Sequence, residues 1–206
     1  MASIYQKFWK RVFDIFFALL ILVILSPVIL LIMVIQILIY KGDIFYIQNR
    51  NTLGEKEFGL IKFTTMTDKK DALGNLLPDP DRLTIFGRVL RRTSFDEIPN
   101  LLNVIVGDLS FVGPRPLPTK FLPLMSQSQK IRYKVKSGIT GLAQINGRND
   151  LTWKEKFELD AIYVHNQTFI NDLRILFRTT FIFFKKSINK DLNSNGIDNY
   201  KPDFNF

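Results

Sequence analysis

The stretch Ile15–Tyr40, IFFALLILVILSPVILLIMVIQILIY, determines how the rest of this chain can fold. It holds 26 consecutive uncharged residues, nearly all of them aliphatic or Phe. A helix of this length would extend about 39 Å, which exceeds the roughly 30 Å hydrocarbon core of a bilayer. A secretory signal peptide has a shorter apolar region and a small-residue cleavage site, and the sequence has neither feature. We therefore expect residues 1–41 to remain in the mature protein as a membrane anchor.

The centre of this apolar stretch carries Ser26-Pro27, which predicts a kink because proline lacks a backbone donor and clashes with the preceding turn. Basic residues flank both ends of the stretch: Lys7, Lys10, Arg11, Lys41 and Arg50. A spanning helix normally shows an asymmetry in such charges. Two interpretations remain open from these residues: a helix–break–helix that re-enters and leaves on the same side, and a kinked spanning helix.

Composition limits the classes of function. The 206 residues suit one compact domain plus the anchor. With 28 Lys and Arg against 19 Asp and Glu, the net charge of +9 favours polyanionic partners such as nucleic acid, anionic lipid or phosphorylated small molecules. The 19 Phe residues fit a bilayer interface better than a nucleic-acid-binding surface. The sequence contains no cysteine and only His165, which excludes thiol catalysis, zinc–thiolate sites and two-histidine metal sites.

After the anchor, residues 42–190 form the predicted catalytic domain. Two strands, 43–48 and 57–63, are expected to form a small β-hairpin around a turn at 51–54. The polar segment 68–81 is expected to be an exposed loop, followed by a helix over 82–90.

Further along the chain, Gly113–Pro116 predicts a rigid extended segment because its prolines restrict their neighbours. Residues 138–149 contain several glycines without helical periodicity, so we expect a structured loop. Residues 151–190 are expected to be helical, and the mixed apolar and basic pattern of 172–190 fits either an interfacial amphipathic helix or a helix packed on the domain. The polar residues 191–206 are expected to form a flexible tail. The predicted fold class is a helix-rich α+β fold.

The most suggestive chemical group is the adjacent pair Asp96 and Glu97. We expect Thr93 or Ser94 to cap a helix whose first turn carries both carboxylates. Together with the preceding Arg91, such a helix start forms a basin for anions. A carboxylate beside a phosphate basin and Mg²⁺ suits covalent phosphoryl transfer. Acidic residues in a first helical turn are nevertheless common, so the pair alone does not establish a site.

Three further basic residues are candidate phosphate ligands. Arg115 is held between two prolines, which suits bidentate phosphate recognition. Lys62 lies near the end of a predicted strand, and Arg148 lies in the glycine-rich loop. Each of them alone could equally be a solvated surface charge.

Five blocks of sequence together resemble the bacterial sugar transferase family. They are Lys62–Met66 (KFTTM), Arg82–Gly87 (RLTIFG), Arg91–Leu101 (RRTSFDEIPNL), Asn103–Pro116 (NVIVGDLSFVGPRP) and Gly138–Asn149 (GITGLAQINGRN). The resemblance extends from about residue 5 to about residue 190. More narrowly, the chain is similar to the small monotopic polyprenyl-phosphate phosphoglycosyl transferases of bacterial glycan biosynthesis.

The resemblance implies a reaction and assigns roles. A sugar-1-phosphate would move from a UDP-sugar to polyprenol (undecaprenyl) phosphate through a covalent intermediate on Asp96, with release of UMP. Glu97 would help to bind Mg²⁺, a metal that Asp96 would also contact, or activate the acceptor. The implied substrate-binding residues are Lys62, Arg91, Arg115 and Arg148.

The resemblance also implies a location and leaves some questions open. The enzyme would lie in the bacterial inner (cytoplasmic) membrane with its catalytic domain on the cytoplasmic face, and Ser26-Pro27 matches the break of a re-entrant anchor. Asp160 and Asp172 match acidic positions without an assigned role. No nucleic-acid partner is implied. The sugar is not specified, although a UDP-linked acetamido or deoxy-amino sugar fits best, and the oligomeric state is not predicted.

This sequence departs from the family pattern at Ser137, where proline is usual, and at Thr64, where a basic residue is usual. The first departure loosens a loop and the second removes one positive charge near the phosphate site. Two alternatives from other classes remain: a non-catalytic module that binds anionic lipid, and a Mg²⁺-dependent phosphohydrolase.

Overall fold

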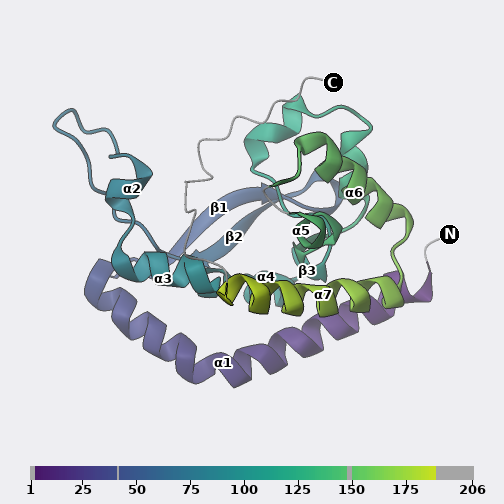
Figure 1. Cartoon of the computed structure of the whole chain (residues 1–206), viewed down its shortest axis with the longest axis horizontal. Coiled ribbons are helices and arrows are strands. Elements are labelled where there is room, and N and C mark those ends of the chain that lie inside the picture. The colour runs from purple at the N-terminus through teal and green to yellow at the C-terminus, as the bar shows by residue number, and fades with distance from the viewer. Residues whose placement is uncertain (1–2, 41, 148–149, 189–206) are drawn as a thin grey trace.

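A long N-terminal helix, α1 (Lys10–Tyr40), lies along one side of the rest of the molecule (Figure 1). The computed structural model describes residues 3–40, 42–147 and 150–188. One π-helical turn, η1 (Tyr5–Trp9), precedes α1. Together they form a 36-residue helix that is long and apolar enough to cross a membrane.

The predicted break at Ser26-Pro27 is a bend and not an interruption, because α1 continues through Pro27. The helix changes direction near its middle (Figure 1). Proline cannot donate to the carbonyl of Val23, four residues earlier. The hydroxyl of Ser26 donates to that carbonyl instead, at 2.8 Å. The serine therefore compensates for the lost hydrogen bond and keeps the bent helix continuous.

Both ends of α1 are held by the same domain. Near the N-terminal end, the Asp14 carboxylate accepts a hydrogen bond from the backbone N–H of Phe111 (3.1 Å). Near the other end, Gln36 donates to the carbonyl of Thr64 (2.9 Å). Between these contacts the helix exposes large apolar side chains, among them Leu19, Leu20, Val23, Ile24, Leu30, Leu31 and Val34. The middle of the helix is thus apolar and open, while its two ends are anchored on one side.

The predicted hairpin is confirmed. Strands β1 (Phe45–Asn51) and β2 (Glu57–Phe63) pair antiparallel, with Tyr46 opposite Lys62. The first strand was predicted over 43–48, too early at both ends, because pairing with β2 begins at Phe45 and continues to Asn51. A second, parallel pair joins β3 (Leu109–Val112) to β4 (Ser137–Thr140).

Helices make up most of the remaining domain. The α-helices are α2 (Asp79–Arg82), α3 (Ile85–Thr93), α4 (Asn100–Val106), α5 (Leu142–Asn146), α6 (Trp153–His165) and α7 (Phe169–Ile188). The 3₁₀ turns are η2 (Leu53–Glu55), η3 (Phe95–Glu97), η4 (Thr119–Leu124) and η5 (Gln129–Lys134). The helix-rich α+β class is confirmed.

Several sequence-based boundaries need correction. The predicted loop over 138–149 contains β4 and α5, because Gly138 and its neighbours pair with β3, a partner distant in sequence. The helix predicted over 82–90 begins and ends later, as α3. The predicted helical region 151–190 is two helices, α6 and α7, separated at residues 166–168. The predicted tail 191–206 lies outside the described residues.

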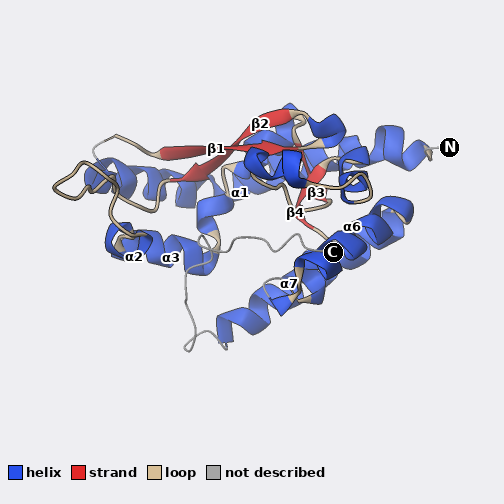
Figure 2. Cartoon of the chain, turned by 90° about the horizontal axis from the view of Figure 1, so that it is seen from above, coloured by secondary structure: helices blue, strands red, loops and turns tan. Residues whose placement is uncertain are grey.

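The main hydrophobic core lies between α1, the hairpin and α4. It includes Ala18, Phe63, Leu90, Val104 and Leu109, each of which is buried. Seen from above, the hairpin lies over α1, and α6 and α7 lie to one side (Figure 2). Helix α7 buries Ile175 against β3 while exposing Ile170, Leu173 and Phe177, so it packs on the domain and also presents an apolar surface.

Candidate active site

The acidic pair lies on the short turn η3, between α3 and α4. Ser94 links α3 to η3 in the left-handed conformation (φ 61°), which reverses the chain. The predicted capping by Thr93 or Ser94 is wrong. Thr93 donates its hydroxyl to carbonyls within α3, and the Ser94 side chain makes no cap hydrogen bond. Backbone reversal, not a hydroxyl cap, therefore places Asp96 and Glu97.

Asn103 fixes the distance between this turn and the hairpin. Its amide oxygen accepts from the N–H of Ile61 (3.1 Å), and its amide nitrogen donates to the carbonyl of Gly59 (2.8 Å). Asn103 is buried, so these bonds satisfy backbone groups that would otherwise be unpaired at the outer edge of β2. Helix α4 is thereby attached to β2, and Lys62 at the end of that strand lies beside Glu97.

A three-membered ion cluster forms around Glu97. One oxygen of its carboxylate, Oε1, accepts from Lys62 Nζ (2.9 Å) and from Arg115 Nη2 (3.0 Å). Burial alone would raise the pKa of Glu97, but Arg115 and Lys62 hold it well below its usual range. Glu97 is therefore ionised, and the second cation leaves excess positive charge that suits a phosphate.

Asp96 differs from its neighbour although the two are adjacent. Burial and the Glu97 carboxylate raise the pKa of Asp96 to about 6, against the opposing effects of Lys62 and Arg91. Within the described residues no side chain donates a hydrogen bond to this carboxylate. Arg91 donates instead through Nε to the Thr65 hydroxyl (2.9 Å). The Asp96 carboxylate is thus half-buried, close to cations and available to a ligand.

Arg115 projects from a segment of backbone that is held closely. Pro114 and Pro116 are buried, whereas the Arg115 side chain is exposed. Gly113 tolerates no side chain, because a Cβ there would lie 2.2 Å from the carbonyl oxygen of Lys136. The expectation of a rigid segment agrees with these contacts.

A small recess opens beside the ion cluster. It is lined by Glu97, Asn100, Arg115 and Gly138, among others. The side-chain oxygen of Asn100 is buried there without a hydrogen-bond partner among the described residues. A buried acceptor of this kind normally pairs with a ligand or a water molecule, so the recess is suited to a polar ligand group.

The acidic pair fits a metal ion only in part. The described residues contain no cluster of three or more acidic or histidine side chains that could form a complete metal cage. Mg²⁺ commonly binds through one or two carboxylates together with substrate phosphates and water. Because both cations contact Oε1 of Glu97, its other oxygen and the Asp96 carboxylate remain as suitable ligands for a Mg²⁺ that binds with a diphosphate.

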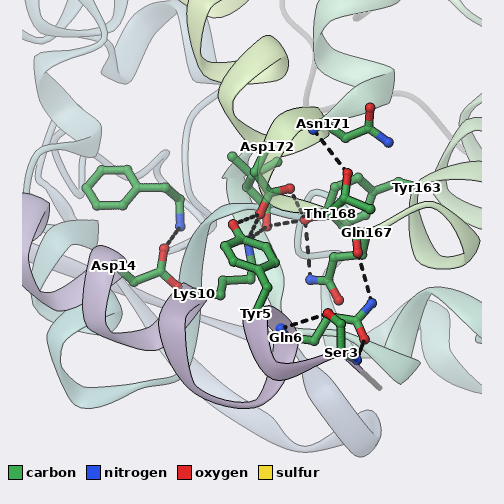
Figure 3. A network of polar contacts seen from close by, with 12 residues as sticks. Ser3, Tyr5, Gln6, Lys10, Asp14, Tyr163, Gln167, Thr168, Asn171 and Asp172 are labelled. Carbon is green, nitrogen blue, oxygen red and sulfur yellow. Dashed lines mark hydrogen bonds and ion pairs between the residues drawn. The ribbon is translucent and has the colours of Figure 1, made fainter. Parts of the chain in front are cut away.

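The remaining candidates lie elsewhere. Asp160 forms a buried ion pair with Arg132 (3.2 Å). Asp172 belongs to a network near the N-terminal end of α1, where it pairs with Lys10 (Figure 3). Arg148 lies outside the described residues. Of the predicted site residues, the structure therefore brings Lys62, Glu97 and Arg115 into direct contact, with Asp96 and Arg91 close by.

Two residues near the site make contacts that the sequence does not reveal. Asn103 lies within the block NVIVGDLSFVGPRP, and its bonds to β2 depend on the position of a distant strand. Arg132 lies in the segment QKIRYK, whose pattern does not distinguish a buried arginine from a solvated one. In both cases the function of the side chain arises from tertiary contacts.

Comparison with known proteins identifies relatives across nearly the whole chain. The "Uncharacterized sugar transferase EpsL" of Bacillus subtilis (strain 168) is 52% identical over 167 residues, covering 81% of this chain and 83% of that protein. The "UDP-glucose:undecaprenyl-phosphate glucose-1-phosphate transferase" of Caulobacter vibrioides is 34% identical, covering 82% of this chain and 67% of that protein. The "Undecaprenyl-phosphate galactose phosphotransferase" of Salmonella typhimurium is 34% identical, covering 88% of this chain but 41% of that protein. The bacterial sugar transferase profile matches residues 5–186, and the chain therefore belongs to the bacterial sugar transferase family.

Proposed function

We propose that this protein transfers a sugar-1-phosphate from a UDP-sugar to polyprenol phosphate, with Asp96 as the covalent nucleophile. The proposal rests on the Asp96 carboxylate, to which no described side chain donates a hydrogen bond. This carboxylate lies beside the cluster of Lys62, Glu97 and Arg115. The relatives support the substrate classes, since two of them are named for transfer of a sugar phosphate to undecaprenyl phosphate. Those two differ in the sugar that they transfer, so the sugar stays unspecified for this chain.

The proposed chemistry proceeds in two displacements. A carboxylate oxygen of Asp96 forms a bond to the phosphorus that carries the sugar, and the bond from that phosphorus to the bridging oxygen breaks. UMP leaves with the electron pair. A phosphate oxygen of polyprenol phosphate then attacks the same phosphorus, and the Asp96 carboxylate leaves unchanged. Lys62 and Arg115 hold the negatively charged phosphoryl oxygens in both steps.

Mg²⁺ is part of the proposal. Bound to Asp96 and Glu97 together with the diphosphate, it would neutralise phosphate charge. The contacts to Lys62 and Arg115 keep Glu97 ionised and correctly oriented for this role. Arg91, close to Asp96, would add positive charge on the same side, and Arg148 is proposed to contact the nucleotide.

We also propose that α1 enters and leaves the membrane on the same side. Its two ends bind one domain through Asp14 and Gln36, which argues against ends on opposite faces of a bilayer. The bend at Pro27 would lie deepest in the lipid, and the exposed apolar residues of α7 would contact the interface. The acceptor lipid then reaches Asp96 from the membrane, on the cytoplasmic face of the inner membrane.

The test is UMP release by the purified, detergent-solubilised protein with Mg²⁺, a panel of UDP-sugars and undecaprenyl phosphate. Repeated UMP release that requires the lipid supports the transferase, with at most one UMP per protein molecule released when the lipid is absent. Repeated release without lipid would identify a phosphohydrolase, and no release with any UDP-sugar would favour a lipid-binding module. A covalent sugar phosphate trapped on Asp96 without acceptor, detected by mass spectrometry, would establish the intermediate; turnover by Asp96→Asn would exclude it.

A further inference from the structure

The backbone around Arg115 is held at each carbonyl. The carbonyl of Pro114 accepts from the N–H of Gly138 (2.9 Å). The carbonyl of Pro116 accepts from the Arg50 guanidinium (3.1 Å). Between them, the carbonyl of Arg115 itself accepts from Nη2 of Arg132. The residue that pairs with Glu97 is therefore fixed through its own main chain by a second arginine.

Arg132 is an unusual choice for this contact because its side chain is only 3% exposed. Its guanidinium lies 5.5 Å from the centre of the Phe157 ring and 3.2 Å from Asp160 Oδ2. The Asp160 side chain is 4% exposed, so both charges are removed from water. Burying such a pair contributes little net stability compared with apolar residues of similar size. Stability alone therefore does not account for an ion pair at this position.

Geometry indicates what the pair does. Nη2 of Arg132 contacts both the Arg115 carbonyl and Asp160, so Asp160 on α6 sets where that nitrogen lies. Arg115 in turn places its guanidinium 3.0 Å from Glu97. A continuous series of contacts thus connects helix α6 to the acidic pair.

We propose that Arg132 and Asp160 are positioning residues, which hold the Arg115 backbone so that its guanidinium reaches the substrate diphosphate. The proposal rests on the proposed function, since it assumes that Arg115 binds phosphate. It assigns a role to Asp160, which is too deeply buried to meet substrate directly. The two residues act through Arg115 and do not take part in the chemistry.

The decisive experiment is a double-variant cycle on UDP affinity, measured by titration calorimetry with the full-length protein. The first change is Arg132→Met with Asp160→Ala, which removes both charges together and so leaves no unpaired buried charge. The second change is Arg115→Ala. Lys130→Met is the matched control, because Lys130 lies on the same turn η5 and pairs with Glu55 (3.1 Å) without contacting the Arg115 segment.

If the pair positions Arg115, its removal weakens UDP binding roughly 10-fold, since a shift of about 1 Å in a binding group has effects of up to about 100-fold. In the Arg115→Ala background the same removal changes UDP affinity by less than about twofold, because the group being positioned is gone. Equal losses in both backgrounds would overturn the inference and indicate a purely structural pair. The Lys130→Met control is expected to bind UDP like the unaltered protein.

A second variant keeps the inference testable if the charge-free pair does not fold. Arg132→Lys retains a charge for Asp160 but loses the planar fork that reaches two acceptors at once. It is expected to weaken UDP binding only where Arg115 is present, and unchanged UDP affinity in a folded protein would overturn the proposal. Turnover by the unaltered protein distinguishes failure of the proposed function from failure of the positioning role. Absence of UMP release would contradict the proposed function. UMP release combined with additive effects of the two changes on UDP affinity would contradict only the positioning role.

Discussion

Asp96 and Asp172 show two different uses of an aspartate in one small domain. Asp172 is buried, and both of its oxygens are occupied. Oδ2 accepts from Lys10 Nζ (2.5 Å) and the Tyr5 hydroxyl (2.6 Å), and Oδ1 accepts from the Tyr163 hydroxyl (2.8 Å), as Figure 3 shows. Asp96 is half-buried, and no described side chain donates to it. The first carboxylate has its hydrogen-bonding capacity satisfied by the protein, and the second does not.

Hydrogen bonding from the protein distinguishes an aspartate that stabilises the fold from one that is available for chemistry. Lone pairs that accept three charged or hydroxyl donors are not free to attack phosphorus. The Asp172 network instead joins η1 and α1 to α6 and α7, so it attaches the anchor to the domain. Asp96 has cations nearby but no described side chain that donates to it, which leaves its carboxylate available to a substrate. The two sites are expected to respond in opposite ways to equivalent substitutions.

The largest expected effect is on catalysis at Asp96. Asp96→Asn preserves the shape of the side chain but removes the nucleophile, so UMP release with UDP-sugar and lipid falls by roughly 10⁴-fold or more. The melting temperature is expected to stay the same or to rise, because repulsion with Glu97 is removed. Asp81→Asn, on α2, is the control. A large loss of stability in Asp96→Asn would mean that this carboxylate stabilises the fold, as Asp172 does.

The converse change is Asp172→Asn, which removes the buried carboxylate that forms the ion pair with Lys10. Breaking a buried pair in this way costs about 3–5 kcal/mol of unfolding free energy. Denaturant unfolding in detergent measures the loss, and the fraction that remains folded is expected to keep its turnover number. Replacing both charges, as Lys10→Met with Asp172→Leu, is expected to recover most of the stability. A folded Asp172→Asn protein with no turnover would contradict the comparison.

Much of this arrangement was predictable from local sequence, and the remainder depends on contacts between distant segments. The apolar run predicted helix α1, and the segment 57–63 beside a turn predicted β2 with its final boundaries. The resemblance to the bacterial sugar transferase family implied a shared site of Asp96 and Glu97 with Lys62 and Arg115. The β4 strand was missed because a strand of a few residues exists only through its pairing with β3.

The same reason explains the roles that the sequence left open. Asp160 and Asp172 have ordinary neighbours in sequence, and nothing local indicates that one pairs with Arg132 and the other with Lys10. Burial decides their roles, and burial is a property of the folded chain. The bend at Pro27 was predicted, and a continuous helix was one of two open interpretations. The choice depends on the Ser26 hydroxyl, which compensates for the missing donor.

Effects of intermediate size are expected when the lysine near each aspartate is replaced. Lys62→Met removes one of the two cations on Glu97, so we expect turnover to fall roughly 100- to 1,000-fold, as is typical when one donor to a developing charge is lost. Its effect on stability is expected to be about 1 kcal/mol or less, because the pair is partly exposed and Arg115 remains. Lys10→Met is expected to reverse this order, with a large loss of stability and unchanged turnover of the folded protein. Initial rates of UMP release and denaturant unfolding measure both quantities, and similar results for the two variants would remove the distinction.

The smallest effects are expected from the two tyrosines that donate to Asp172. Tyr163→Phe leaves Oδ1 without a donor, and an unsatisfied buried acceptor costs about 1–3 kcal/mol of unfolding free energy. Tyr5→Phe costs less, about 0.5–1.5 kcal/mol, because Oδ2 keeps its ion pair with Lys10. Neither change touches the Asp96 site, so initial rates of UMP release at a temperature well below unfolding are expected to match those of the unaltered protein. Denaturant unfolding ranks the pair, and a larger loss from Tyr5→Phe than from Tyr163→Phe would mean that Asp172 depends on the η1 turn more than on α6.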